Sequence, residues 1–457
     1  MSSKNQSSGS RKKIVIAALG ESLPDNIPGF AYLPKEHQAQ LCYLIWRYGM
    51  PRARHERIGW GEYMTIHYQT LRKHFGKNGF QIINEKLNLF HVTTNWHSKD
   101  KQTKGYKPTD KVLAIKQQCM DECARLKNLK MIDSVGKEIK TLPKAIPYRD
   151  SKNQPAKVWN DVLIPNVVSI NHNGLSAYQC QLELNLAKEK DPEKMAKYQR
   201  DKDAAQYLDL LARTALAGFG KIHQSYQESP SGRLYGQDIS LQYAPRRIRQ
   251  AALAGCYMYD IENCHFALLN QQASRLGCNL TAIEHYLNNK PEVRKRIAFD
   301  IGLTIDEVKK CLIAIMYGAR PTTYPETNAL PDTVGVQKAK ALLLHPLFDS
   351  IYQDVRKARN VILDNTEVTR NRITNLADKK MHTQGKTKEK LLAHMLQGIE
   401  ALALKTIVTT NPGRIIVLLH DGVVSNQRLE PAAIKNAIKQ VTGYDLNISG
   451  GLIEQPA

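Results

Sequence analysis

Two aspartates interrupt short apolar segments of the kind that form β-strands. Asp260 lies in YDIENCH and Asp421 lies in LLHDGVV. A carboxylate among apolar residues is costly to bury unless a cation accompanies it. Two carboxylates and a backbone carbonyl, here that of Ile261, form a ligand set that suits Mg²⁺. Two such ions, roughly 3.5–4 Å apart, can activate a hydroxyl nucleophile and neutralise a triphosphate, so the pair indicates phosphoryl transfer. Either aspartate alone would more often be a turn or cap residue.

The segment DEVKKCLIAIMYGA lies between the two aspartates. It predicts a helix on which Lys309 and Tyr317, eight positions apart, share one face, with Gly318 directly after them. Lys309 could then contact a triphosphate, and Tyr317 could stack beside a base pair. A solvated lysine and a Tyr-Gly helix end are common, so the spacing is informative only because of its place between the aspartates.

Arginines cluster in two places before the first aspartate. SPSGRLY contains Gly232 and Arg233, and PRRIR contains Arg246, Arg247 and Arg249. Both clusters could follow a phosphate backbone. The alternatives are ordinary turn chemistry for the first cluster and a solvated helix face for the second.

In order and spacing, these elements resemble the nucleotide-polymerising core of family A DNA polymerases and of single-subunit, phage- and mitochondrion-type RNA polymerases. The resemblance covers residues 226–450. It implies two Mg²⁺ ions, with Mn²⁺ as a substitute, bound by Asp260, Ile261 and Asp421. The residues to which it assigns catalytic roles are Asp260, Asp421, Lys309, Tyr317 and His420. It also implies that Arg233 contacts template or hybrid phosphate.

The chain departs from these families at positions that select the sugar. Family A DNA polymerases place a glutamate five residues after the first aspartate, where it crowds a 2′-hydroxyl; here that residue is His265. His394, four residues before Gly398, matches a histidine with which single-subunit RNA polymerases recognise the ribose. The resemblance therefore favours ribonucleotides. The nucleotide-binding residues that it implies are His265, His394, Gly318 and Gln397. A packed, hydrogen-bonded histidine is the alternative for His265.

Two further departures concern charge. Ile305 stands where an arginine of the fingers helix is expected. The residues that could supply the charge instead are Arg294, Lys295, Arg296 and Lys310. Gly422 follows Asp421 where the families usually have Ser or Glu, which removes a possible third carboxylate.

The composition is compatible with a polyanionic partner. Lys and Arg number 65 against 43 Asp and Glu, a formal net charge of +22. The eight cysteines form no CxxC pair, and we interpret them as buried free thiols in a reducing compartment. No stretch of 18 apolar residues occurs, so we expect a soluble protein, cytoplasmic or otherwise intracellular, with no membrane partner.

The chain divides into four predicted regions. Residues 1–12 form a disordered basic tail, and residues 13–175 form a basic N-terminal accessory domain that binds nucleic acid. Residues 176–226 form a helical thumb or stalk, and residues 227–457 form palm and fingers. The expected fold class is α+β and largely helical: a right-hand polymerase core whose antiparallel palm sheet carries both aspartates. Segment 376–390 is expected to be a basic, mobile connection.

Within the N-terminal domain, residues 51–110 hold 11 Lys and Arg against 5 Asp and Glu. The predicted order is a helix over YMTIHYQTLRKHF, a turn, a second helix over FQIINEKLNLF, and a hairpin around the loop HSKDKQTK. That order is typical of a winged helix, in which one helix enters a major groove of duplex DNA and the hairpin touches phosphates. A solvated loop on an ordinary accessory domain is the alternative.

We therefore expect a template-directed nucleotidyltransferase that synthesises RNA on DNA, as a primase or a minimal RNA polymerase of a mobile replicon. Its expected partners are a DNA template, an RNA or DNA product and nucleoside triphosphates, with a helicase or other replication protein as a further partner. Two alternatives remain open. One is a family A-like DNA polymerase that extends primers with dNTPs, and the other is a non-catalytic replication initiator.

Overall fold

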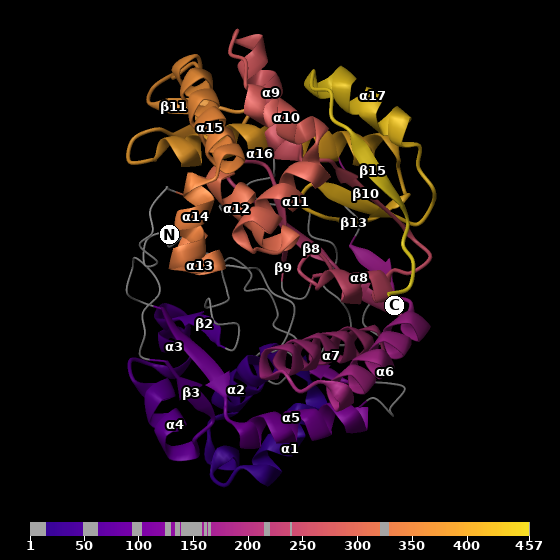
Figure 1. Cartoon of the computed structure of the whole chain (residues 1–457). Coiled ribbons are helices and arrows are strands. Elements are labelled where there is room, and N and C mark those ends of the chain that lie inside the picture. The colour runs from indigo at the N-terminus through magenta and orange to yellow at the C-terminus, as the bar shows by residue number, and fades with distance from the viewer. Residues whose placement is uncertain are drawn as a thin grey trace, which may run out of the picture.

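A computed structural model describes residues 15–48, 63–93, 103–123, 129–132, 138, 158–159, 162, 166–213, 220–237, 240–319 and 329–456. The chain is largely helical with small antiparallel sheets. An N-terminal unit and a larger unit that carries both aspartates lie at opposite ends, and a pair of long helices lies between them (Figure 1). The predicted disordered tail, residues 1–12, falls outside the described residues.

A four-stranded antiparallel sheet forms the centre of the larger unit, in the order β13-β14-β10-β15. Its strands are β10 (Tyr257–Ile261), β13 (Ile415–Leu418), β14 (Gly422–Ser425) and β15 (Ile448–Leu452). Side chains on neighbouring positions of β14 enter different cores: Val423 joins the core under the helices, and Val424 joins the core on the other face. Both faces of this sheet are therefore covered, as the nearly continuous apolar strands require.

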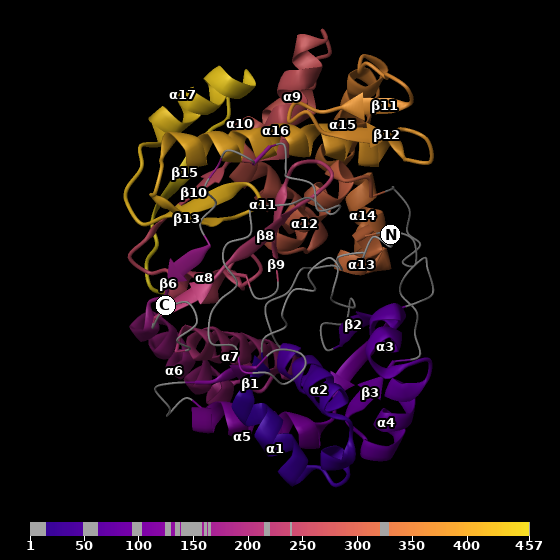
Figure 2. The same cartoon turned by 180° about the vertical axis from the view of Figure 1, so that it is seen from behind.

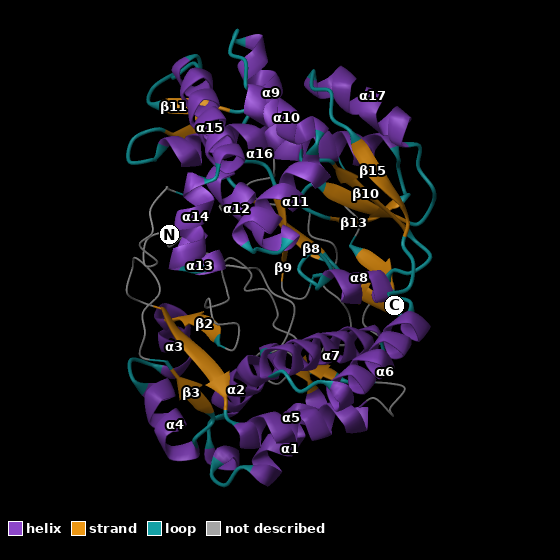
Figure 3. Ribbon diagram, in the orientation of Figure 1, coloured by secondary structure: helices purple, strands orange, loops and turns teal. Residues whose placement is uncertain are grey.

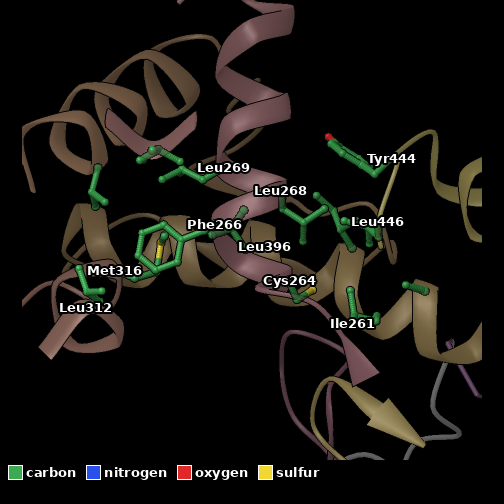
Figure 4. Close-up of a cluster of buried hydrophobic side chains, with 14 of the residues drawn as sticks. Ile261, Cys264, Phe266, Leu268, Leu269, Leu312, Met316, Leu396, Tyr444 and Leu446 are labelled. Carbon is green, nitrogen blue, oxygen red and sulfur yellow. The ribbon is translucent and has the colours of Figure 1, made fainter. Parts of the chain in front are cut away.

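Three helices cover the first face of the sheet: α9 (Cys264–Arg275), α16 (Lys388–Thr410) and α17 (Pro431–Thr442). Figure 4 shows this core, in which Phe266 and Leu268 of α9 lie near Leu396 of α16. Helix α16 has the length and mean hydropathy (1.4) of a membrane-spanning helix, but 67% of that window is buried inside the protein. It therefore packs as a core helix.

The opposite face of the sheet packs on α6 (His172–Lys188), α7 (Pro192–Ala212) and α8 (Arg246–Ala252). Helix α7 also contributes Tyr207 to the core of the N-terminal unit, where the Trp46 indole N–H donates to its hydroxyl (2.7 Å). The expected helical region ends at Ala212, well before residue 226. The following strands are β7 (Lys221–His223), β8 (Ser225–Glu228) and β9 (Leu234–Gln237). Every second residue from Ile222 to Glu228 is buried, the period of a strand.

A group of helices follows α9 and surrounds the segment Lys309 to Gly318, which the sequence assigns to the fingers. They are α10 (Thr281–Asn288), α11 (Lys290–Ile301), α12 (Ile305–Met316), α13 (Ala329–Val334), α14 (Val336–Leu344) and α15 (Pro346–Asp364). Helix α12 begins at a capping box, in which Thr304 and Glu307 satisfy each other's backbone N–H groups. This cap fixes the start of the helix that carries Lys309.

Segment 376–390 is not the mobile connection that its composition predicts. Strands β11 (Arg372–Thr374) and β12 (Lys380–His382) pair as a hairpin, and α16 begins at Lys388. The buried Asn375 side chain anchors the hairpin by donating to two backbone carbonyls, those of Ser231 (2.9 Å) and His394 (2.9 Å). Figure 2 shows both strands beside α15 and α16.

The N-terminal unit contains the order of elements expected of a winged helix. Its described elements are β1 (Val15–Ile16), α1 (Ala17–Asn26), a 3₁₀ turn (Phe30–Tyr32), α2 (Lys35–Arg47), β2 (Met64–His67), α3 (Tyr68–Phe75), α4 (Gly79–Leu87), β3 (Phe90–Val92), β4 (Thr103–Pro108) and α5 (Asp110–Cys123). Strands β2, β3 and β4 form an antiparallel sheet in the order β2-β4-β3 (Figure 3). Most of the expected loop HSKDKQTK lies outside the described residues.

The helix predicted over YMTIHYQTLRKHF begins later in the structure than the sequence indicates. Met64–His67 is a strand paired with β4, and α3 starts only at Tyr68. Adjacent β-branched residues, Thr65 and Ile66, favour extended backbone. Two further pairs of short strands are antiparallel: β5 (Met131–Ile132) pairs with β1, and β6 (Val167–Ser169) pairs with β7.

All eight cysteines are free thiols. Six are buried, as expected, but Cys256 is only partly buried and Cys180 is exposed on α6. Cys180 therefore corrects the prediction that all the thiols are internal.

Candidate active site

The sheet brings the two aspartates together. Asp260 lies in the central strand β10, opposite Gly422 in β14, and Asp421 lies in the turn between β13 and β14. The Ile261 N–H donates to the Asp421 carbonyl (2.8 Å), which fixes that turn against the end of β10. The two carboxyl groups are hydrogen-bonded to each other. The sequence predicts this proximity, and the register of β10 and β14 produces it.

The two carboxyl groups cannot both be charged without cost. Burial and the neighbouring Asp421 charge raise the pKa of Asp260 to about 7, against the positive charges of Lys309 and Arg249. Burial and the Glu400 charge raise the pKa of Asp421. The shared hydrogen bond favours a proton on Asp260 and a charge on Asp421. A divalent cation would relieve the same repulsion.

These residues fit a hard divalent cation, although the described residues contain no group of three or more His, Cys, Asp or Glu side chains arranged to hold a metal. Mg²⁺ keeps several of its waters, so two carboxylates and a carbonyl are enough. The residues that would hold it are Asp260, Asp421 and Ile261 through its carbonyl. Binding of a cation would lower the pKa of about 7 at Asp260, because it favours the charged carboxylate.

Gly422 is required by the close approach of β14 to β10. A Cβ atom there would lie 2.4 Å from the Tyr259 carbonyl oxygen and 2.9 Å from an Asp260 carboxyl oxygen. The families that the sequence resembles usually have Ser or Glu at this position. In this chain, the strand separation excludes both side chains, and glycine brings the two aspartates into contact.

Helix α12 places Lys309 and Tyr317 as the spacing predicts. Lys309 is exposed, and its charge acts on Asp260. Tyr317 is the C-terminal cap of α12, and its hydroxyl bonds to His265 Nδ1 (2.8 Å). Gly318 follows with φ +91°, and a Cβ there would lie 2.2 Å from Cγ of Glu389. The glycine therefore permits the first turn of α16 to pack on the end of α12.

The Tyr317 hydroxyl is bonded to a buried polar network of His265, Glu400 and Arg233. His265 Nε2 lies 2.6 Å from Glu400, and the Arg233 guanidinium pairs with the same Glu400 oxygen. The imidazole can satisfy both neighbours by donating from Nε2 to Glu400 and accepting the Tyr317 hydroxyl proton at Nδ1. Glu400 is fully buried. Burial raises the pKa of its carboxyl, but the Arg233 charge and the His265 hydrogen bond outweigh burial, and the net pKa is lowered.

Sequence reasoning missed Glu400. It is a single carboxylate among apolar residues in QGIEALALK, and a charged residue that faces a core must be paired. That isolation was the available signal. Glu400 places a carboxylate next to His265, so the buried network behind Tyr317 contains a glutamate supplied by α16.

Arg233 lies inside this network and not on the surface. Its side chain is 11% exposed. Burial lowers the pKa of Arg233, but the charge and hydrogen bond of Glu400, together with Tyr317 and Tyr235, outweigh burial, and the net pKa is raised. Gly232 (φ +97°) packs against Val158 and Ala401, and its carbonyl accepts the Trp159 indole N–H (3.0 Å). Both residues therefore stabilise the turn between β8 and β9, and template contact by Arg233 stays a prediction.

His394 and Gln397 have packing contacts. The His394 side chain is buried, and its Nε2 donates to the Lys379 carbonyl (3.0 Å), which anchors the β11–β12 hairpin. Burial lowers the pKa of His394. Gln397 accepts from the Ser231 hydroxyl (2.7 Å). In the described structure neither side chain bonds to Tyr317, so the ribose-binding role of His394 stays a prediction without a supporting contact.

His420 lies beside the aspartates, with its ring 5.2 Å from the ring of Tyr235 and 6.2 Å from that of Tyr243. Burial and the Arg233 charge lower its pKa to about 4, so His420 is neutral near pH 7. Its buried Nδ1 atom has no partner among the described residues. A neutral imidazole with a free nitrogen can accept or donate one hydrogen bond to a bound group.

Helix α8 presents the basic cluster that the sequence predicts. Arg246 and Arg247 are exposed. Arg249 is partly buried, and its guanidinium donates to the backbone carbonyls of Leu241 (3.4 Å) and Ala244 (3.5 Å). Burial and the neighbouring Arg246 lower the pKa of Arg249, against the charges of the two aspartates. The cluster therefore divides into two surface arginines and one partly buried arginine whose charge acts on the carboxylates.

The candidate replacements for the missing fingers arginine differ in their contacts. Arg294 donates to the Tyr286 hydroxyl (3.0 Å). Arg296 pairs with Asp300 (2.7 Å) and Lys310 pairs with Asp306 (2.8 Å). Lys295 is exposed. None of these contacts joins a replacement candidate to Asp260 or Asp421.

Comparison with known proteins is sparse. No protein-family model and no curated protein matches the chain. Among solved structures, it is similar to the POL domain of Pol1 from M. smegmatis in complex with DNA primer-template and dNTP, with a TM-score of 0.41 and 14% identity. The match covers 63% of this chain and 67% of that chain. At this level of similarity, the functional assignment depends on the site residues themselves.

Proposed function

We propose that this protein is a template-directed nucleotidyltransferase that transfers nucleotides by two-metal-ion chemistry. One observation supports this most: two half-buried aspartates lie together at the end of β10, and the charge of Lys309, on a helix whose cap is Tyr317, acts on Asp260. Divalent ions bound there would activate the 3′-hydroxyl and neutralise the triphosphate charge. Lys309 would bind the triphosphate, and Tyr317 would stack on the nascent base pair. His420, neutral at pH 7, would contact the primer end.

RNA synthesis is the first form of this proposal. His265 replaces the glutamate that would exclude a 2′-hydroxyl, and it holds the Tyr317 hydroxyl (2.8 Å). In this form the protein is a primase or a minimal RNA polymerase that copies DNA with ribonucleotides.

DNA synthesis is the second form, and Glu400 favours it. This carboxylate lies 2.6 Å from His265 Nε2, and the other ring nitrogen of His265 bonds to the Tyr317 hydroxyl. His265 therefore links Glu400 to Tyr317. Glu400 is fully buried, so it would act on sugar selection through the position that it gives to His265 and Tyr317, and not by direct contact with the 2′-hydroxyl. Under this form His265→Ala would loosen sugar selection, because Glu400 would lose its link to Tyr317.

The test compares labelled NTPs and dNTPs on single-stranded DNA with Mg²⁺, with and without a primer. We expect nucleotide addition that is lost in Asp421→Ala, and the preferred sugar decides between the two forms. Lys439→Gln, an exposed change on α17, is the control. Wild-type protein that adds no nucleotide with either sugar, or an Asp421→Ala variant that retains full activity, would overturn the proposal in favour of a non-catalytic initiator.

We also propose that the N-terminal unit binds duplex DNA. The described winged-helix elements, residues 63–93 and 103–108, contain six Lys and Arg and one Glu. Arg72 and Lys73 are exposed at the end of α3. We expect Arg72→Glu with Lys73→Glu to weaken binding to a duplex without changing nucleotide addition on a single strand. Deleting the unit would be a poorer test, because Tyr207 of α7 lies in its core.

A further inference from the structure

The β11–β12 hairpin combines a buried inner end with a basic outer face. Its inner turn is fixed from three sides. Asn375 binds two backbone carbonyls, Lys379 pairs with the buried Glu228 (2.6 Å), and the Lys379 carbonyl accepts from His394. The Ile373 side chain, between the exposed Arg372 and Thr374, is buried. The hairpin is therefore joined rigidly to the turn that carries Arg233 and to the helix that carries Glu400.

The outer face of the hairpin has exposed basic side chains. Arg372 lies opposite His382 and Thr374 lies opposite Lys380, and all four side chains are exposed. Residues 367–386 hold five Lys and Arg against two Asp and Glu. In a pleated strand pair, side chains of one face line up along the same side. The hairpin thus presents a basic row on an element that is anchored to the β8–β9 turn and to α16.

Arg370 extends this row from a strained turn. Arg370 (φ +52°) and Asn371 (φ +58°) are both left-handed, and Thr369 and Arg372 exchange two backbone hydrogen bonds (2.9 and 3.1 Å). This is a two-residue type I′ turn, which Asn and Gly form most readily. Arginine at its first central position is disfavoured by its own Cβ atom. A strained residue at an exposed tip is an indicator of function.

We propose that this hairpin binds the phosphate backbone of the nucleic acid held at the candidate active site, through Arg370, Arg372 and Lys380. This inference rests on the proposed nucleotidyltransferase function. A rigid basic row matches a phosphate backbone, whose charges are regularly spaced and sequence-independent. Because the inner turn rests on Ser231 and His394, the hairpin would hold the strand in a fixed position relative to the turn that carries Arg233 and to α16.

Arg370→Asn provides the most discriminating test. Asparagine adopts the left-handed conformation readily, so the variant relieves the strain and removes one charge. We expect its melting temperature to rise by about 1–3 °C while its affinity for nucleic acid falls. A residue with a structural role alone would not give this opposite pair of changes.

Binding is measured by fluorescence anisotropy with two labelled probes, a single-stranded oligonucleotide and a primer–template duplex, from 50 to 200 mM salt. Each lost phosphate contact should weaken binding by about tenfold at 50 mM salt and should reduce the slope of log K against log salt by about 0.7–0.9. Arg372→Gln with Lys380→Gln is the second variant, independent of the turn. The probe that responds identifies a single-stranded or a duplex segment as the ligand.

Lys439→Gln on α17, on the opposite side of the unit (Figure 1), removes one exposed charge as the matched control. Hairpin variants that bind both probes like the wild type would overturn the inference, as would a control that weakens binding equally. A wild type that binds neither probe would also overturn it. Wild-type nucleotide addition, measured separately, shows whether the proposed function stands when the hairpin inference fails.

Discussion

Replacing Glu400 by Gln removes a buried charge from the network behind Tyr317. Glu400 is 0% exposed, and its partners Arg233 and His265 are 11% and 9% exposed. Glutamine has nearly the same volume, so no cavity forms and the effect is electrostatic. The variant leaves the Arg233 guanidinium buried without its counter-charge, which costs about 3–5 kcal/mol in comparable buried pairs.

The free energy of unfolding in urea measures this loss. The double variant Arg233→Met with Glu400→Gln buries no charge, so we expect it to recover most of the stability lost by Glu400→Gln alone. Stability that falls by less than about 1 kcal/mol in the single variant, or losses that simply add in the double variant, would refute the reasoning.

The pH dependence gives an independent check. The pKa of Glu400 is lower in the folded state than in the unfolded chain. The stabilisation from its charge is therefore complete above the unfolded pKa, about 4.3. It is lost as pH falls through the lower folded pKa. The stability difference between wild type and Glu400→Gln should accordingly be constant near neutral pH and shrink below about pH 4.

Three further results are expected. Gly422→Ala should destabilise the sheet by about 1–3 kcal/mol in urea denaturation and abolish nucleotide addition, because its Cβ would press on the Tyr259 carbonyl and on Asp260. Asp260→Asn should raise the melting temperature of metal-free protein while nucleotide addition falls by several orders of magnitude, because it removes one of two repelling carboxylates; a lower melting temperature would count against that repulsion. His394→Gln should leave the NTP-to-dNTP ratio of kcat/KM unchanged, since its imidazole bonds to the Lys379 carbonyl, and a shift in that ratio would restore the ribose-binding role.

The positions of the main catalytic candidates were predictable because each depends on local structure. An aspartate that interrupts an apolar segment identifies Asp260 in β10 and Asp421 in the turn after β13. A period of 3.6 residues predicts that Lys309 and Tyr317 share one face, and they lie in α12 and at its C-terminal cap. The capping box at Thr304 and Glu307 starts that helix where the sequence indicates. Similar local rules predicted α4 in the N-terminal unit to within a few residues of FQIINEKLNLF.

Other predictions failed where a distant contact outweighed local composition. A basic, polar sequence led to the expectation of a mobile connection at 376–390, yet the amide of Asn375 finds two carbonyls from distant parts of the chain and fixes the hairpin. Arg233 appears in the sequence as a surface phosphate ligand, but α16 supplies the carboxylate that buries it. Cys180 is exposed although its sequence context gave no sign of this.

The sequence by itself determined the chemical types in the site: two carboxylates, a lysine and a tyrosine on one helix, and basic clusters around them. These follow from residue identity and from short-range periodicity, which act over a few residues. Only the tertiary structure decided which groups meet. The register of β10 and β14 excludes any side chain at position 422, and the packing of α16 brings Glu400 to His265 and Arg233. Such pairings join residues more than 100 positions apart, and close packing selects them because a buried charge requires a partner.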